Sequence, residues 1–395
     1  MKKLWQIGRT KLDPAVEAFE TGDDLLMDQK LVKYDALVSI AHAKMLGKIG
    51  ILTKAEVQSL TRTLKTIIAL DQKGKFILKK GDEDVHTAIE NYLVAHCGNV
   101  GKKIHAGRSR NDQVATAIRL YTKEQIDLIV VSLKSLTNAF YRFSHNYQNI
   151  QMPGYTHMQK AMPSTVGVWA GSIASSLKDD IRLIDSIYQL IDQSPLGSAA
   201  GYGSPLPVDK EMTAKLLGFS RVQENPLYCQ NSRGKFEAAI LSGLVQILLT
   251  LNKFAADVML FTTSEFAFFD VDSSVTTGSS IMPQKKNVDV AELLRSKVHL
   301  VLGHYTALVS LASNLPSGYN RDLQDTKKPL MESFAIMQSS IQVAQILLEH
   351  ISPDTKKLSA AMTPELFAAH EALKFVQKGT SFRDAYRQVK QRLRQ

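Results

Sequence analysis

The chain has 395 residues, 44% of them hydrophobic and 22% charged, and no Pro/Gly/Ser-rich linker or internal repeat interrupts it, so we expect a continuous globular fold. Its net charge of +10 would suit nucleic acid, acidic lipid or an anionic substrate, but seven basic residues against one acid lie between Lys374 and Gln395. We interpret that terminal stretch as a solvated helix face, with nucleic-acid binding as the alternative, and the rest of the chain as mildly basic.

The N-terminal part predicts no secretory signal, because residues 1–9 carry charges with no apolar stretch behind them. The two cysteines, Cys97 and Cys229, offer neither a disulfide framework nor metal-ligand spacing, which suits a reducing cytoplasm. We therefore expect a cytoplasmic protein. We place its domain boundaries near 105 and 355, giving an N-terminal domain 1–105, a central helical bundle domain 106–355 and a shortened C-terminal domain 356–395.

Helical periodicity runs through most of the chain. Apolar residues recur at three- and four-residue spacing from Ile126 to Phe143 and again from Val166 to Ile184. Residues 237–261 are apolar around most of the helix circumference, and 289–311 form a further long helix. The most apolar run, 239–251, is about half of the ~20 residues that span a bilayer, so we expect a buried bundle helix and no membrane partner. Strand patterns are scarce, apart from a candidate short hairpin near Phe76, and the prediction is an all-α fold.

The long apolar helices predict an oligomer. Three or more of them exceed what the core of a single subunit needs, so we expect their faces to be buried against partner subunits. A monomeric all-α protein is the alternative.

Four polar segments interrupt the helices. The first, His105-Ala-Gly-Arg-Ser-Arg-Asn-Asp-Gln113, precedes a long helix and suits a carboxylate ligand, because guanidinium, hydroxyl, amide and helix N-terminus all donate. Simple N-capping by Ser109 or Asn111 would explain it equally well. The second, Gly154-Tyr-Thr-His-Met-Gln-Lys160, holds a lone histidine, a residue type that is more often structural than catalytic.

The third segment, Thr277-Gly-Ser-Ser-Ile-Met-Pro-Gln-Lys-Lys-Asn287, combines a mobile turn with lysines before a helix. Such a loop can close over an anion, and the Lys285 charge and Asn287 amide would stabilise a carboxylate that gains charge when a neighbouring proton is removed. A solvated lysine loop is the alternative. The fourth, Tyr319-Asn-Arg-Asp-Leu-Gln-Asp-Thr-Lys327, could hold a zwitterionic or guanidinium-bearing group, or could be a polar helix start.

Cofactor patterns are missing from the sequence. We find no metal-ligand spacing, phosphate loop or dinucleotide fingerprint, so we expect no cofactor and no metal. The chemistry would then depend on acids, bases and electrostatics alone.

Taken together, these segments resemble the fumarase/aspartase superfamily, and within it the argininosuccinate lyases. The stretch from Gly278 to Asn287 resembles the superfamily signature, and its Gln-Lys-Lys variant is typical of these lyases. Five further blocks match in the right order: Ser39-Ile-Ala-His-Ala-Lys44, Asp84-Val-His-Thr-Ala88, Gly107-Arg-Ser-Arg-Asn-Asp-Gln113, Gly154-Tyr-Thr-His-Met-Gln159 and Tyr319-Asn-Arg-Asp-Leu-Gln324. The similarity covers nearly the whole chain.

This resemblance implies a homotetramer around a central helical bundle, with each active site shared between subunits, and reversible β-elimination of argininosuccinate to L-arginine and fumarate in arginine biosynthesis. Ser279 would be the base that takes the β-proton, and His157, paired with Glu292, the acid-side or orienting group. A serine can act as a base only in a closed, dry loop with donors nearby. The proton source for the leaving guanidinium stays open.

The same matching implies the substrate-binding residues. The fumarate-forming half would be held by Ser109, Arg110, Asn111, Thr156, Lys285 and Asn287. The arginine half would be held by Tyr319, Gln324 and Lys327, and His86 lies in a block that lines the site.

The sequence also departs from the family pattern. Val288 stands where the signature usually has proline, and Gly234 occupies the place of an arginine, so we assign no substrate contact there. The segment Phe19-Glu-Thr-Gly-Asp-Asp24 lacks the usual serine, which leaves its substrate contacts open.

Other functions remain open at this point. Adenylosuccinate lyase, fumarase and aspartase share the loop chemistry but expel other groups, and Gln284-Lys285-Lys286 with the Tyr319 block favours argininosuccinate. A structural protein on the same scaffold, as in lens δ-crystallins, is the alternative from another class.

Overall fold

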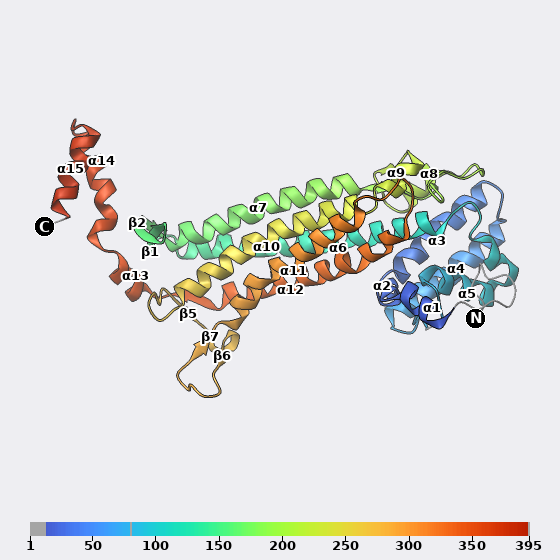
Figure 1. The fold of residues 1–395 in the computed structure, drawn as a ribbon, viewed down its shortest axis with the longest axis horizontal. Helices are drawn as coiled ribbons and strands as arrows, with labels where there is room; N and C mark the ends of the chain where they lie inside the picture. The colour runs from blue at the N-terminus through green and yellow to red at the C-terminus, as the bar shows by residue number, and fades with distance from the viewer. Residues whose placement is uncertain (1–12, 80, 394–395) are drawn as a thin grey trace. The chain divides into compact units, whose positions relative to one another are not determined.

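The computed structural model describes residues 13–79 and 81–393, so the segment for which we expect no secretory signal, residues 1–9, lies outside them. These residues form α-helices with only short strands, which confirms the all-α prediction. Five long helices dominate Figure 1. They are α6 (Arg110–Asn146), α7 (Val166–Ile191), α10 (Lys235–Phe261), α11 (Asp289–Ala312) and α12 (Lys327–Glu349).

The chain divides into two compact units, each of which contains part of every long helix. The first unit comprises residues up to Ile129 together with Leu183–Leu244 and Leu300–Ile336, and the second comprises Val130–Arg182, Val245–His299 and the residues from Met337 onward. The three-domain division of the chain near 105 and 355 stays a prediction.

The first unit adds short helices and one two-stranded parallel sheet to its share of the long helices. Its other elements are α1 (Pro14–Thr21), α2 (Asp24–Gln29), α3 (Val32–Lys48), α4 (Lys54–Gln72), α5 (Val85–Cys97), η1 (Gly98–Lys103), β3 (Gln193–Ser194), α8 (Lys210–Leu216), β4 (Arg221–Val222), α9 (Pro226–Asn231) and η3 (Arg321–Thr326). Within it, the ring of Tyr121 on α6 packs edge-on against Tyr34 of α3 and Phe334 of α12, which joins the N-terminal helices to the long ones.

The second unit contains three antiparallel strand pairs and the C-terminal helices. Its other elements are β1 (Gln151–Thr156), β2 (Gln159–Thr165), β5 (Phe269–Val271), η2 (Ser273–Val275), β6 (Thr277–Gly278), β7 (Lys286–Asn287), β8 (Ile351–Pro353), α13 (Thr355–Ala361), η4 (Pro364–Phe367), α14 (Ala368–Gln377) and α15 (Phe382–Arg392). An aromatic cluster fills its core, in which Phe140, Trp169 and Phe254 meet from three different long helices.

The prediction of a candidate short hairpin near Phe76 is wrong. The segment around Phe76 has no strand, and its backbone is satisfied by one side chain instead of a neighbouring strand. Gln29 donates its amide to the Phe76 carbonyl (2.8 Å) and accepts from the Leu78 N–H (3.0 Å). The true hairpins, β1–β2 and β6–β7, carry the second and third polar segments (Figure 1).

Helix α10 is longer than the apolar run suggests. Its 27 residues are long and apolar enough to cross a membrane, by length and composition only, and 56% of its most apolar window is buried inside the chain. Core helices of soluble proteins share both properties, and Phe254 on α10 lies in the aromatic core described above.

Candidate active site

A polar cleft in the first unit gathers side chains from five parts of the chain. Charged residues of both signs line it, and most of them are at least half-buried. The lining residues are Asp24, Asp28, Glu83, Asp84, His86, Arg110, Asn111, Val114, Arg233, Tyr319, Arg321, Gln324 and Lys327.

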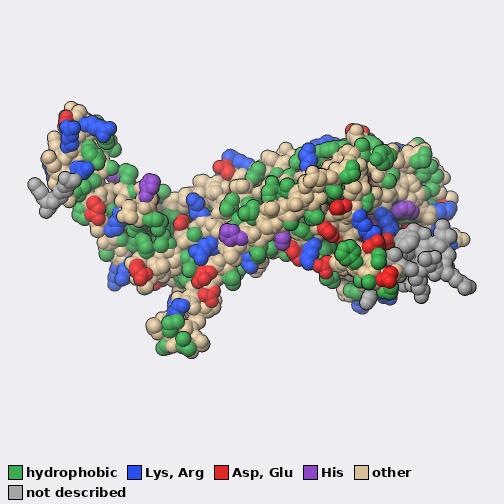
Figure 2. Space-filling model, in the orientation of Figure 1, with side chains coloured by type: hydrophobic (Ala, Val, Ile, Leu, Met, Phe, Trp, Pro, Cys, Tyr) green, Lys and Arg blue, Asp and Glu red, His purple; other side chains and the backbone are tan. Residues whose placement is uncertain are grey.

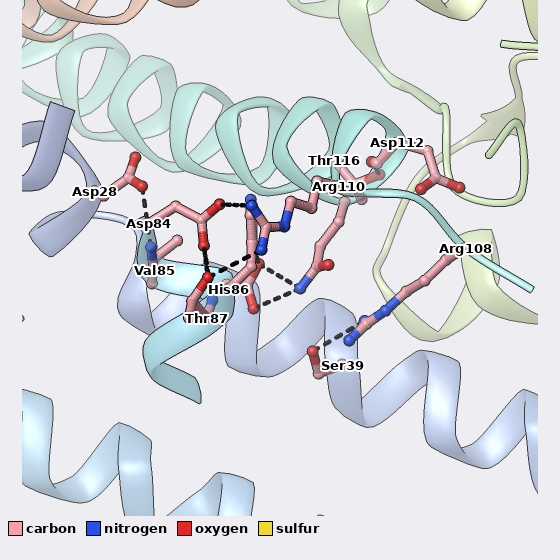
Figure 3. A network of polar contacts seen from close by, with 12 residues as sticks. Asp28, Ser39, Asp84, Val85, His86, Thr87, Arg108, Arg110, Asp112 and Thr116 are labelled. Carbon is pink, nitrogen blue, oxygen red and sulfur yellow. Dashed lines mark hydrogen bonds and ion pairs between the residues drawn. The ribbon is translucent and has the colours of Figure 1, made fainter. Parts of the chain in front are cut away.

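The start of α6 contributes Arg110 and Asn111 to this cleft. Ser109, just before the helix, accepts the Asn111 N–H with its hydroxyl (3.3 Å), so the capping interpretation of this segment is correct in part. Arg110 is only partly exposed, and its guanidinium bonds to Glu83 (3.0 Å) and Asp84 (3.2 Å), as Figure 3 shows for Asp84. Although burial alone would raise it, the pKa of Asp84 lies below its usual value because His86 and Arg110 are close.

The neighbouring arginine, Arg108, extends toward Ser39 in Figure 3 and donates to the Ser39 hydroxyl (3.0 Å). Asp112, fully buried, accepts backbone N–H groups from Ser109 (2.9 Å), Gly197 (3.0 Å) and Ala199 (2.9 Å). Burial raises the pKa of Asp112 to about 6, and these three donors oppose that rise. Asp112 therefore holds the loop after β3 against the start of α6, and this fixes where Arg110 lies.

His86 forms a buried pair at the base of the cleft. Its Nδ1 lies 2.5 Å from the carboxylate of Asp35, which also accepts two bonds from the Gln113 amide (3.0 Å each). Burial alone would lower the pKa of His86, but the Asp35 carboxylate outweighs it and the pKa is raised. His86 therefore favours the imidazolium form, oriented by Asp35.

Lys327 is held between two carboxylates. Its Nζ lies 2.7 Å from Asp24 and 2.8 Å from Asp28, and its side chain is only 5% exposed. Burial alone would lower the pKa of Lys327, but the carboxylates of Asp28 and Asp24 outweigh burial and the pKa is raised. The ammonium therefore stays charged. Asp24 behaves differently from an ordinary ion-pair partner, because burial and the like charge of Asp28 raise its pKa to about 6 despite Lys327.

Tyr319 and Gln324 border the other side of the cleft. The Gln324 amide donates to the Glu20 carbonyl (2.9 Å), which links η3 to α1. The Tyr319 ring faces the guanidinium of Arg233, with 4.7 Å between the guanidinium carbon and the ring centroid. The sequence interpretation omitted Arg233 because its segment departs from the family pattern.

The β1–β2 hairpin of the second unit carries Thr156 and His157, both exposed. His157 and Met158 form its turn with φ of 51° and 59°, a left-handed conformation that non-glycine residues seldom adopt. This backbone presents the imidazole to solvent, and strained turns of this kind gather at functional sites.

The β6–β7 loop carries Ser279 and Lys285. Asn287, the last residue of β7, pairs with Thr277, the first residue of β6. The Ser279 hydroxyl accepts the N–H groups of Ile281 (3.4 Å) and Met282 (3.2 Å). Ile281 is 83% exposed, and Figure 2 shows apolar side chains at the tip of this projecting loop.

Helix α11 begins directly after this loop. Val288, which replaces the usual proline, is buried and its carbonyl accepts the Ala291 N–H (2.9 Å). Glu292 lies in the first turn of α11 and is exposed.

The structure thus brings together six of the expected site residues in one cleft, whereas Ser109, which precedes Arg110 in the chain, is not among the lining residues. These six are His86, Arg110, Asn111, Tyr319, Gln324 and Lys327. The others, Thr156, His157, Ser279, Lys285, Asn287 and Glu292, lie in the second unit and do not line this cleft. The expected roles of all these residues stay predictions.

Sequence reasoning missed the acidic side of the cleft. Glu83 and Asp84 neighbour His86 in a block that was recognised, and Asp24 and Asp28 lie in or next to the N-terminal segment whose contacts were left open. These acids could have been found only from their closeness to Arg110 and Lys327. The sequence does not show that closeness, because partners far apart in sequence meet only after folding.

Comparisons with known proteins identify the family of the chain. Residues 9–303 match the family model described as "Lyase". The argininosuccinate lyase of Thermotoga neapolitana is 47% identical over 392 residues, covering 98% of this chain and 97% of that protein. The argininosuccinate lyase of Parabacteroides distasonis is 41% identical, covering 98% and 87%.

Solved structures share the fold. A class II fumarase from Schistosoma mansoni aligns with a TM-score of 0.81 at 16% identity, covering 95% of this chain and 91% of that one. A fumarate lyase:delta crystallin from Brucella melitensis aligns with a TM-score of 0.80 at 20% identity, covering 96% of this chain and 88% of that one. With close relatives matched over nearly their whole length, the chain belongs to the argininosuccinate lyase family.

Proposed function

We propose that this protein splits argininosuccinate into L-arginine and fumarate, as a carbon–nitrogen lyase. The observation that carries the proposal is the mixed-charge cleft, where Arg110, Asn111 and Lys327 lie with Tyr319 and Gln324. Argininosuccinate itself combines three carboxylates with an ammonium and a guanidinium group. A cleft with both signs of charge matches that substrate better than malate, which carries only two carboxylates.

The proposed chemistry is a proton removal followed by loss of the guanidinium group. The Ser279 oxygen, as its alkoxide, takes the proton from the β-carbon, and the electron pair of that C–H bond forms the new double bond. The C–N bond breaks with its electron pair on the guanidino nitrogen, which takes up a proton to give the guanidinium of L-arginine. Two backbone N–H groups already point at the Ser279 hydroxyl oxygen, and the same donors would stabilise it as an alkoxide. In this proposal Lys285 and Asn287 stabilise the carboxylate that gains charge as the proton leaves.

The remaining residues divide between the two halves of the substrate. Ser109, Arg110, Asn111 and Thr156 hold the carboxylates of the fumarate-forming half, and Tyr319, Gln324 and Lys327 hold the arginine half. His157, oriented by Glu292, acts on the acid side of the reaction. Because His157 and Glu292 are exposed, they are open to contact with another subunit.

We propose that the protein is a homotetramer with active sites shared between subunits. Exposed leucines on the long helices, such as Leu293 and Leu300 of α11, support buried faces between subunits. A cytoplasmic location also belongs to this proposal and suits the free thiols of Cys97 and Cys229.

The direct test is the release of fumarate, followed by its ultraviolet absorbance. Purified protein should produce fumarate from argininosuccinate and not from adenylosuccinate or malate. Equal rates with adenylosuccinate or malate would contradict the choice of substrate.

A structural protein on this scaffold is the second candidate, and Ser279→Ala separates it from an enzyme. We expect that variant to lose turnover while keeping helical content by circular dichroism and assembly by size-exclusion chromatography. Ser279 is only half-buried and lies in a loop outside the helical core, so a large effect on folding is unexpected. Wild-type protein that is already inert with argininosuccinate would favour the structural candidate.

A further inference from the structure

The charged groups of the cleft are paired, with one exception. Arg110 bonds to Glu83 and Asp84, and Lys327 bonds to Asp24 and Asp28. Arg321 lies 3.6 Å from a Glu20 carboxylate oxygen. His86 is paired with Asp35. Within residues 13–79 and 81–393, no carboxylate forms an ion pair with Arg233, which also lines the cleft.

Arg233 is also buried. Its side chain is 5% exposed, and its Nη1 has no hydrogen-bond partner among the described residues. The acid that follows it in the chain, Glu237, is occupied elsewhere, because it accepts the Gly234 N–H (2.7 Å). A buried guanidinium without a counter-ion costs several kcal/mol, and an anionic ligand would offset that cost.

The local backbone explains why the arginine is at position 233. Gly234 has φ of 80°, and a Cβ at this position would lie 2.6 Å from the Cβ of Ala312. A side chain at 234 is therefore excluded by both conformation and contact. The turn between α9 and α10 can present a guanidinium to the cleft from position 233, where the Tyr319 ring supports it.

We propose that Arg233 is a further substrate-binding residue, whose guanidinium binds the α-carboxylate of the arginine half of argininosuccinate. This inference rests on the proposed function, in which Tyr319, Gln324 and Lys327 hold that half. Lys327 and Arg110 each already bind two carboxylates, whereas Arg233 forms no ion pair within the part of the chain that the structure describes. A carboxylate of the substrate therefore meets its full charge at Arg233. The planar guanidinium can bind a carboxylate through two parallel hydrogen bonds while its face stays on the tyrosine ring.

The test compares L-arginine with agmatine, which is arginine without its carboxylate. Binding of each to the full-length protein, and of fumarate, is measured by calorimetry in wild type and Arg233→Gln. We expect Arg233→Gln to weaken arginine binding by about tenfold to a hundredfold, the usual effect of losing a hydrogen-bonded charge partner, and to leave agmatine and fumarate unchanged. In the reverse reaction the KM for arginine should rise by a similar factor.

Two controls support the interpretation. Lys235→Gln removes an exposed cation two residues away and should change none of these affinities. Arg233→Lys should recover part of the arginine affinity, and it replaces Arg233→Gln as the test variant if the glutamine protein does not fold.

Unchanged arginine affinity in Arg233→Gln would overturn the inference. An equal loss of affinity for arginine, agmatine and fumarate would also overturn it, because it would mean that Arg233 has a structural role. A loss of affinity for fumarate alone would overturn it as well. These outcomes are distinct from failure of the proposed function, because that failure appears as wild-type protein that releases no fumarate from argininosuccinate.

Discussion

At the scale of single residues, paired charges inside the cleft fix the positions of the binding groups. Asp35 accepts from both His86 and Gln113, and Asp84 and Glu83 both contact Arg110. Each carboxylate therefore holds in place a residue that the sequence analysis expected to contact the substrate. Held in this way, the cations lose little conformational entropy when substrate binds.

We predict that Asp35→Asn destabilises the protein in a pH-dependent way. Removing one partner of a buried ion pair costs about 3 kcal/mol. The folded pKa of His86 is raised, so the stabilisation is complete below the pKa of about 6.5 that histidine has when unfolded. It is lost as the pH rises through the folded pKa of His86.

The measurement is urea unfolding of wild type and Asp35→Asn across this pH range. The difference in unfolding free energy should be largest at pH 6 and smaller at pH 9. A difference that stays constant over the range would show that His86 is not protonated in the folded protein.

At the scale of elements, two hairpins carry the exposed functional candidates. The β1–β2 hairpin ends in a turn with two consecutive left-handed residues, and the β6–β7 hairpin extends into the loop with Ser279 (Figure 1). Both present polar groups outward from the second unit. Their exposure is consistent with completion of an active site by contact between subunits.

We predict that His157→Asn abolishes most of the activity without harming the fold. Asparagine tolerates positive φ better than most residues, so the turn should keep its shape while the imidazole is lost. Turnover should fall by about 10²–10⁴-fold, the usual contribution of a general acid or base.

Fumarate production and thermal unfolding together check this prediction. Met158→Gly is the matched control, because it relaxes the neighbouring turn residue and leaves the imidazole in place. Normal turnover in His157→Asn would remove His157 from the mechanism.

At the scale of the whole molecule, the long helices present apolar side chains that the single chain leaves uncovered. On α11, Leu293 is 60% exposed and Leu300 is 49% exposed. Seven residues apart, they lie on one side of the helix, the spacing of helices that pack against each other. This face would be buried in the proposed tetramer.

We predict that the double variant Leu293→Glu, Leu300→Glu dissociates the protein into smaller species. Two carboxylates on an apolar face between subunits should oppose assembly, and turnover should fall because the sites are shared. Size-exclusion chromatography with light scattering measures the mass. The control variant is Thr306→Glu, which changes an exposed residue on another side of α11. This variant should keep the mass of the wild-type assembly.

Local spacing and the ordered motif blocks were sufficient to predict the helical fold, the polar segments and the family. Helical periodicity depends on local spacing, so it predicted α7, α10 and α11 closely, but it covered only part of α6 and did not identify α12. The same rules failed near Phe76, where a contact to Gln29, 47 residues earlier, satisfies the backbone. Local patterns cannot report such a partner.

Only the tertiary structure decided which side chains share the cleft and how they are charged. It revealed Asp24 and Asp28 around Lys327, and it revealed Arg233 without a counter-ion among the residues that the structure describes. Pairing and burial depend on distances between residues that are up to 303 positions apart in the chain, as Asp24 and Lys327 are. The physical reason is that electrostatic energy depends on position in space and on desolvation, and neither is encoded in the order of neighbouring residues.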